Sequence, residues 1–389
     1  MSSIGELLDQ RKFKEAYDLL VSERKEDNED WNRSMIVCCY YVDKHDEARR
    51  AMDRIMFRNR WNRDICVANM CWYTTDIRKH ATLVNFSNEA LSIISEETCG
   101  ELRKTYFPSN PSIYKHKDGF VANIRFVTYY VLENQYLHTT SDNTINTENA
   151  LVFYDNNMVE LRRVRITDTR NRYYTMIKGI EDLRICHYDG KYVTFIATVV
   201  DYQPEFYRVM PRMVSGKINV ETGLIEEYFM PQIKFEGRCE KNWVPLLGSD
   251  EFVYQFGSHD IELVVPSKDK FESRTVSQTL NLDNLRGSTQ VVPYKEGYIT
   301  VVHEVYQLSN EQKDRRRYIH RFVELDSNLL ALRCSSPFKY SDEGIQYIAG
   351  LCYDDNNDRF IFSGSVNDRD ARMYSITSST LEKLINHEI

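Results

Sequence analysis

The sequence predicts a mainly β fold, in which an N-terminal α-helical segment precedes a five-bladed β-propeller. After Phe86 the hydrophobic period changes from three- and four-residue spacing to alternation, which is typical of strands. Turn signals then recur at Asp118-Gly119, Asn156-Asn157, Asp189-Gly190, Thr222-Gly223, Glu296-Gly297 and Asn356-Asn357. We therefore expect a helical segment over residues 1–82 and a propeller over residues 83–389.

The N-terminal segment has helical periodicity from Ile4 to about Tyr73. Two stretches about 32 residues apart resemble each other, as in the helix-turn-helix repeats of tetratricopeptide proteins. The matched residues are Lys12, Glu15, Ala16 and Leu20 in the first stretch, and Lys44, Glu47, Ala48 and Met52 in the second. So few repeats do not form a stable solenoid alone, so we expect them to pack on the propeller, on a protein partner or on a second copy. Trp31, Trp61 and Trp72 are expected in the core.

Composition narrows the classes of function. The 389 residues carry a net charge of −8, and their basic residues are scattered among acids, so neither nucleic acid nor a membrane surface is an expected partner. Nine cysteines, including adjacent Cys38 and Cys39 but no Cys-x-x-Cys, indicate reduced thiols. Because the sequence shows neither an apolar signal-peptide core nor an apolar stretch long enough for a membrane-spanning helix, we expect a cytoplasmic protein. No metal-ligand cluster or glycine-rich phosphate loop is evident, and no cofactor is expected.

The β region divides into five similar segments, each of which opens with a polar cluster before an apolar strand. The openings are Asn110 to Ile113, Glu181 to Arg184, Glu240 to Trp243, Arg286 to Gln290, and Ile348 to Leu351. In a propeller the innermost strand of each blade lines a central channel. We therefore expect Asn110, Asp182, Lys241, Arg286 and Gly350 to surround one mouth.

The stretch from Gly179 to Arg184 is unusual for the start of a core strand. Alternation would place Asp182 and Arg184 on one face and would keep Ile180 and Leu183 from packing together. Asp189-Gly190 then predicts a tight turn between two strands. An acid beside a guanidinium indicates either a proton donor or sugar ligand, or a structural ion pair at a strand end.

Several of these motifs together resemble those of the mannoside phosphorylases, glycoside hydrolase family 130. They are Asn110-Pro111, Gly179-x-Glu181-Asp182-x-Arg184, Lys241-Asn242, His303 and Val366-Asn367-Asp368. The resemblance covers roughly Tyr106 to Ile376 and implies a five-bladed propeller. With its helical segment the chain also resembles glycan-building proteins of large DNA viruses and some bacteria, and related propellers include β-1,2-mannosyltransferases.

The resemblance implies inverting transfer at a β-mannosidic bond, with Asp182 as the proton donor acting through a sugar hydroxyl. It places Arg208, Lys241 and His303 at the phosphate. Asn110, Arg125 and Asp368, beside Glu181 and Arg184 of the motif, would hold the sugar, and Phe206 or Tyr207 would stack on it. The implied partners are a mannose-containing glycan and inorganic phosphate, mannose 1-phosphate or a nucleotide sugar.

The sequence departs from the family pattern at two places. Leu183 stands where phosphorylases usually carry proline, and Tyr254 to His259 contains no match for their His-Arg pair. A transferase working in the synthetic direction therefore stays open. So does an inverting hydrolase, for which Glu304, Asp260 or Asp368 is the available base. A propeller that binds glycan or protein without chemistry is the third possibility. Two structural alternatives also stay open. His303 beside Glu304 is then a core histidine, and Val366 to Asp370 is a simple turn.

Overall fold

The computed structural model describes residues 3–26, 28–42, 44, 47–48, 50–51, 74–86, 91–97, 100–132, 135–140, 142–171, 173, 175–202, 210–235, 237–283, 285–308, 315–342 and 344–388. Trp61, Trp72, Met52, Phe206, Tyr207 and Arg208 lie outside these residues. In the described part, no helix is long and apolar enough to cross a membrane.

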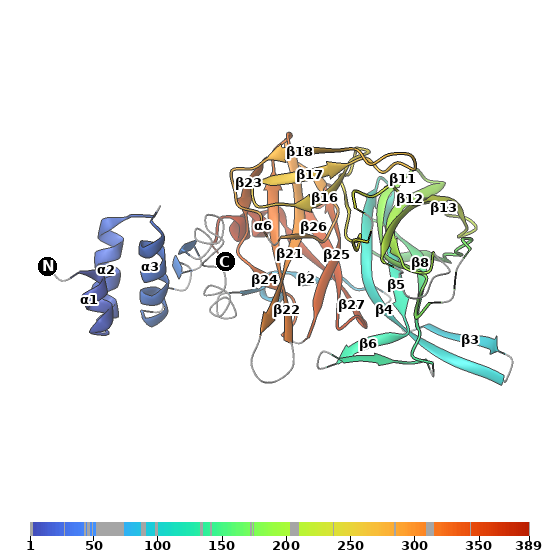
Figure 1. The fold of residues 1–389 in the computed structure, drawn as a ribbon, viewed down its shortest axis with the longest axis horizontal. Coiled ribbons are helices and arrows are strands. Elements are labelled where there is room, and N and C mark those ends of the chain that lie inside the picture. The colour runs from blue at the N-terminus through green and yellow to red at the C-terminus, as the bar shows by residue number, and fades with distance from the viewer. Residues whose placement is uncertain are drawn as a thin grey trace.

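Among the helices whose bounds fall within the described residues, three short ones lie in the N-terminal part: α1 (Ile4–Asp9), α2 (Phe13–Glu23) and α3 (Glu29–Tyr41). Ser3 and Glu6 form a capping box at α1, and the Asn28 side chain caps α3. These helices project to one side of the β-sheets (Figure 1). Their buried cluster includes Ala16 and Ala48, the small residues of the two matched stretches, and also Ile319 from a propeller strand. The tetratricopeptide-like repeat itself stays a prediction.

The rest of the chain is mainly β, as expected, and its sheets have a propeller-like arrangement (Figure 1). One six-stranded sheet contains β3 (Leu91–Glu97), β4 (Gly100–His116), β5 (Gly119–Val127), β8 (Ile145–Tyr154), β9 (Glu160–Arg165) and β10 (Ile177–Lys178). A four-stranded sheet follows with β11 (Ile180–Tyr188), β12 (Tyr192–Val199), β13 (Arg212–Asn219) and β14 (Ile225–Phe229). The next four-stranded sheet has β15 (Val244–Pro245), β16 (Phe252–Phe256), β17 (Asp260–Val264) and β18 (Ser273–Ser277).

Two further sheets recruit strands from the segment before Phe86. A seven-stranded sheet contains β19 (Arg286–Gly287), β20 (Val292–Tyr294), β21 (Gly297–Leu308), β22 (Arg315–Leu325), β23 (Ala331–Cys334), β24 (Phe338–Lys339) and β1 (Thr75–Asp76). A four-stranded sheet contains β25 (Gln346–Asp354), β26 (Arg359–Val366), β27 (Asp370–Thr377) and β2 (Thr82–Leu83). A hairpin, β6 (Tyr129–Leu132) and β7 (Gln135–His138), and a C-terminal helix, α6 (Ser378–Ile385), complete the fold, with a 3₁₀ turn at Ile77–Lys79.

The prediction of five four-stranded blades is wrong. Among the described sheets, three have four strands, and the others have six, seven and two. Pairing of β1 with β24 and of β2 with β27 adds N-terminal strands to C-terminal sheets. β1 lies within the segment expected to be helical, and β2 begins at its last residue. The domain boundary at residue 82 stays a prediction.

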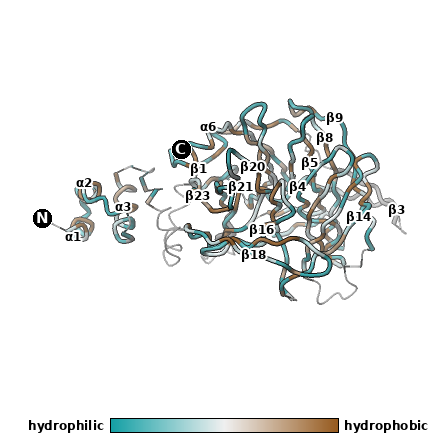
Figure 2. The backbone as a smooth tube through the Cα atoms, turned by 90° about the horizontal axis from the view of Figure 1, so that it is seen from above, coloured by the Kyte–Doolittle hydropathy of each residue, from teal (hydrophilic) through white to brown (hydrophobic). Residues whose placement is uncertain are grey.

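The core lies between the sheets. Hydrophilic and hydrophobic residues are mixed along the backbone of the β part (Figure 2), and β5 is buried along its whole length. The turn at Asp189-Gly190 joins β11 to β12 as expected, with Gly190 at a φ of 96°. The alternation expected from Ile180 to Arg184 is wrong, because Ile180 and Leu183 pack in one buried cluster. The cause is a β-bulge, in which Asp182 and Leu183 stand between the pairs Glu181↔Thr198 and Arg184↔Ile196.

The buried side chain of Gln290 connects the inner strands. Its amide nitrogen lies 3.1 Å from Ser112 Oγ on β4, 3.1 Å from the Ile113 carbonyl and 3.2 Å from the Ile185 carbonyl on β11. Its amide oxygen accepts a bond from the Leu351 backbone N–H on β25 at 3.3 Å. The adjacent Val291 forms a bridge with Leu246, next to β15. One side chain therefore satisfies polar groups from three sheets.

Gln290→Leu should lower the free energy of unfolding by about 3 kcal/mol or more, since it leaves several buried polar groups without a partner. Chemical denaturation measures this change. Gln135→Leu, at an exposed position of β7, is the control and should change stability by less than about 0.5 kcal/mol. Equal stability of the two variants would contradict the role given to Gln290.

Candidate active site

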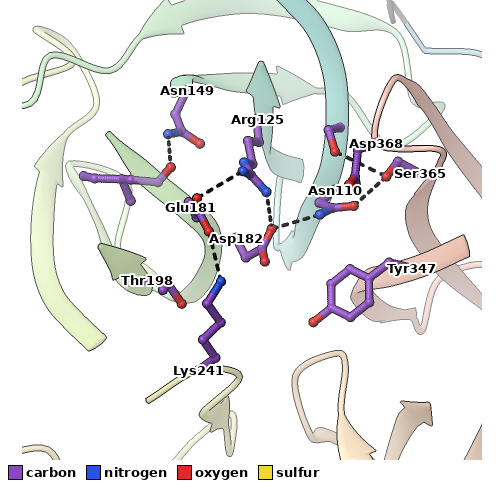
Figure 3. Close-up of polar contacts among 12 residues, drawn as sticks. Asn110, Arg125, Asn149, Glu181, Asp182, Thr198, Lys241, Tyr347, Ser365 and Asp368 are labelled. Carbon is purple, nitrogen blue, oxygen red and sulfur yellow. Dashed lines mark hydrogen bonds and ion pairs between the residues drawn. The ribbon is translucent and has the colours of Figure 1, made fainter. Parts of the chain in front are cut away.

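Of the five residues expected around the mouth, Asn110, Asp182 and Lys241 come together in the structure. Arg125 and Glu181, which were expected to hold the sugar, join them. Asn110 Nδ2 and Arg125 Nη1 both donate to Asp182 Oδ1 at 2.9 Å. Arg125 Nη2 lies 3.6 Å from Glu181 Oε1, and Lys241 Nζ lies 3.3 Å from Glu181 Oε2. Figure 3 shows these side chains pointing toward one another from different elements, with Asp368 beside Asn110.

Two β-bulges orient the side chains of Asn110 and Asp182. On β4, Asn110 and Pro111 are inserted between the pairs Ser109↔Arg125 and Ser112↔Asn123. On β11, Asp182 occupies the equivalent place in its bulge. Both have left-handed backbones, with φ of 41° at Asn110 and 49° at Asp182. Asn and Asp tolerate this region better than most residues, which favours these types at the bulges.

Asp368 reaches the site from a turn between β26 and β27. Asn367 and Asp368 have φ of 56° and 55°, and the Arg369 N–H bonds to the Val366 carbonyl, as in a tight hairpin turn. The interpretation of this stretch as a turn is confirmed. Asp368 Oδ2 accepts a hydrogen bond of 3.3 Å from the Tyr129 hydroxyl. The turn is therefore both a structural element and the support for a carboxyl group at the mouth.

The two aspartates have opposite pKa shifts. Burial raises the pKa of Asp182, but Arg125, Arg184, the Asn110 hydrogen bond and Lys241 lower it, and the net shift is downward. For Asp368, burial is the largest cause and raises the pKa to about 6, with Asp182 and Glu181 adding to the rise against Arg125. Asp182 is therefore ionised in this structure, whereas Asp368 changes charge near neutral pH.

Two of the expected cations, Lys241 and Arg184, differ in their surroundings. Lys241 is partly exposed, and its pKa is raised because Glu181 and Asp182 outweigh the effect of burial, so it stays charged. Arg184 is fully buried, and its guanidinium bonds to the Ser288 carbonyl, to Asn242 Oδ1 and to the Tyr347 hydroxyl. Arg184 and its partners Ser288, Asn242 and Tyr347 are called the floor of the site below. Arg208 lies outside the described residues.

His303 is a buried histidine next to this floor. Its Nδ1 pairs with Ser288 Oγ at 3.0 Å, and its ring contacts Tyr347 edge-on. Burial lowers its pKa well below the usual value, and His320, Arg286 and Arg184 lower it further. His303 is therefore neutral, which matches the core-histidine interpretation. A cationic contact with phosphate does not follow from this geometry.

The two other residues expected around the mouth, Arg286 and Gly350, lie on β19 and β25. Arg286 is exposed on β19 and pairs across the sheet with His303. Gly350 on β25 packs so closely on β4 that an added Cβ would lie 2.7 Å from the Ile113 nitrogen. Gly350 thus allows two inner strands to approach, and it offers the mouth no functional group.

The alternative bases also have defined places. Glu304 is buried in an ion pair with Arg321 at 2.9 Å. Asp260 begins β17, two strands out from β15 in its sheet. Of the three acids, Asp368 is the one that the structure places with Asp182. Among the described residues, no group of three or more His, Cys, Asp and Glu is arranged to hold a metal ion.

The sequence did not predict the roles of Tyr129 and Tyr347, and it placed Gln290 in a polar opening without predicting its contacts. The Tyr347 hydroxyl donates to Asn242 Oδ1 at 3.1 Å and contacts Arg184, so it links β25 to the floor. Tyrosines are frequent in this chain, and nothing local marks these two. Asn242 belonged to a noted motif, and its φ of 62° repeats the left-handed Asx geometry of the mouth.

Comparisons with known proteins find distant similarity to solved structures. No family model and no curated sequence matches the chain. A putative glycoside hydrolase from Parabacteroides distasonis is similar over 76% of this chain and 96% of its own, with 11% identity and a TM-score of 0.49. The β-1,2-mannobiose phosphorylase of Listeria innocua, solved with β-1,2-mannobiose, is similar over 72% and 93%, with 12% identity and a TM-score of 0.45. Neither comparison bears on the resemblance to viral glycan-building proteins.

Asp368→Asn should stabilise the protein at high pH. With its raised pKa of about 6, Asp368 binds a proton in the folded state between about pH 4 and 6 when the unfolded chain does not, so stability falls as pH rises through this window. Removing the charge should recover about 1 to 3 kcal/mol at pH 8 and almost nothing at pH 4. Thermal unfolding at both pH values measures this, with exposed Asp250→Asn as control. A variant less stable than wild type at pH 8 would contradict the assigned environment.

Proposed function

We propose that the protein is a carbohydrate-active enzyme that transfers a mannosyl unit at a β-mannosidic bond with inversion, to or from phosphate. The observation that carries the proposal is the pair of aspartates at one mouth, with pKa values shifted in opposite directions by burial and by Arg125. The mannoside as substrate class comes from the resemblance of the motifs around Asn110, Asp182, Lys241 and Asp368.

In this proposal Asp182 is the proton donor to the glycosidic oxygen, which it reaches through a sugar hydroxyl. Arg125 and Asn110, which both bond to Asp182 Oδ1, compete with protonation. A sugar whose hydroxyls bond to Asn110 and Arg125 would weaken that competition and raise the pKa of Asp182. Phosphate attacks the anomeric carbon as an anion, and the Asp182 proton leaves on the departing oxygen, so no second acid is needed.

Lys241 is the described cation best placed for the phosphate. Its side chain is partly exposed, and the pair with Glu181 fixes it at the edge of the cluster. Arg208 and His303 remain proposed phosphate ligands by resemblance, and His303 would act as a neutral hydrogen-bond partner. Mannose 1-phosphate or a nucleotide sugar would use the same groups in the synthetic direction.

Hydrolysis is the second candidate, and one observation favours it. A carboxyl with a pKa of about 6, as for Asp368, is mostly ionised at pH 7 and is suited to accept a proton from water. Products separate the candidates: with β-1,2-mannobiose, phosphorolysis yields mannose 1-phosphate only when phosphate is present, whereas hydrolysis yields mannose without phosphate. Absence of both products and of mannoside binding would overturn the proposal.

Asp182→Asn should reduce turnover by about 10² to 10⁴, because the amide cannot protonate the leaving oxygen. Binding of the mannoside should change little, since the amide keeps the shape and accepts a bond from Asn110 or Arg125. Steady-state kinetics and calorimetric titration measure the two effects. The Asp250→Asn protein is the matched control. A variant that keeps more than about a tenth of wild-type turnover would remove Asp182 from the role.

A further inference from the structure

The β6–β7 hairpin is attached to the turn that carries Asp368. The Val131 N–H donates to the Asn367 carbonyl at 2.9 Å, and the Tyr129 hydroxyl bonds to Asp368. Val131, Tyr129 and Val127 form a small buried cluster against Ile345, just before β25. The hairpin is therefore fixed at the edge of the mouth by both backbone and side-chain contacts.

The register of the hairpin places an exposed ring on the side that faces Asp368. Tyr129 pairs with His138 and Val131 with Tyr136, so these four side chains share one face. The Tyr136 ring lies 5.4 Å from the Tyr129 ring, centroid to centroid. Tyr129 is buried, whereas Tyr136 is 52% exposed. Tyr129 thus contacts the Asp368 carboxyl through its hydroxyl and the exposed Tyr136 ring through its own ring.

We propose that this face of the hairpin binds the second sugar unit of a mannoside whose first unit lies at Asp182 and Asp368. The Tyr136 ring stacks on the apolar face of that second pyranose. A rigid aromatic surface next to a polar mouth suits a ligand that is apolar on its ring faces and polar at its edges. The inference rests on the proposed function and deepens it, because it assigns the residue that selects chain length.

Tyr136→Ala tests the platform through binding rather than turnover. The affinity for mannobiose and mannotriose should fall about fivefold, as expected for the loss of one stacking contact, whereas the affinity for mannose should stay within about twofold. Tyr136→Phe keeps the ring and should restore binding. Tyr228→Ala is the control, since Tyr228 is also an exposed tyrosine, 41% exposed, on β14. Calorimetric titration of the full chain with each sugar gives the comparison.

The outcomes separate this inference from the proposed function. If wild type binds mannobiose and Tyr136→Ala binds it equally well, the platform is wrong and the proposed function stands. If wild type binds none of the three sugars, the proposed function fails and the platform with it. Equal loss of mannose and mannobiose affinity in Tyr136→Ala would also overturn the inference, because it would indicate a general disturbance of the mouth.

Discussion

The amide of Gln290 is the interaction on which the arrangement of the inner strands most depends. It bonds to groups on β4, β11 and β25 from a chain segment that also contacts β15 through Val291. Neighbouring sheets of a propeller are separate blades arranged around the channel, so backbone hydrogen bonds within one sheet do not fix its position relative to the next. A buried side chain that bonds to strands of three sheets therefore fixes the positions of these strands relative to one another. Such fully satisfied polar groups favour one arrangement over others that leave polar atoms unpaired.

The position of the mouth follows from that constraint. Ser112 Oγ and the Ile185 carbonyl both meet Gln290, and each lies two or three residues beyond a bulge residue, Asn110 or Asp182. Fixing β4 against β11 at this level brings the two bulges within hydrogen-bonding distance. Arg125, paired opposite Ser109, then reaches Asp182 and Glu181 from the neighbouring strand. The charged cluster is thus a consequence of strand register and bulge placement.

The sequence predicted part of this arrangement, and the limits have physical causes. Alternation and turn dipeptides were sufficient for the strands, and motif order was sufficient for Asn110, Asp182 and Lys241 at one mouth. The prediction of five four-stranded blades was wrong in part because β1 and β2 pair with strands distant in the sequence, and such pairing of two-residue strands leaves no local pattern. The packing of Leu183 was wrong because a bulge shifts the alternation by one residue. The contacts of Tyr129 and Gln290 were not predicted because they join segments that are far apart in the sequence.

The electrostatics of the mouth give the account its central claim. Arg125, Arg184 and Lys241 face Glu181, Asp182 and Asp368, so opposite charges balance when Asp368 is ionised. In the proposed function, sugar hydroxyls replace the bonds within this cluster. A crystal structure of the Asp182→Asn variant soaked with β-1,2-mannobiose tests this claim most directly. The account predicts a mannose ring at the mouth, with hydroxyls bonded to Asn110 and Arg125. A sugar bound elsewhere, or an unchanged cluster at a sugar concentration that saturates binding in solution, would contradict it.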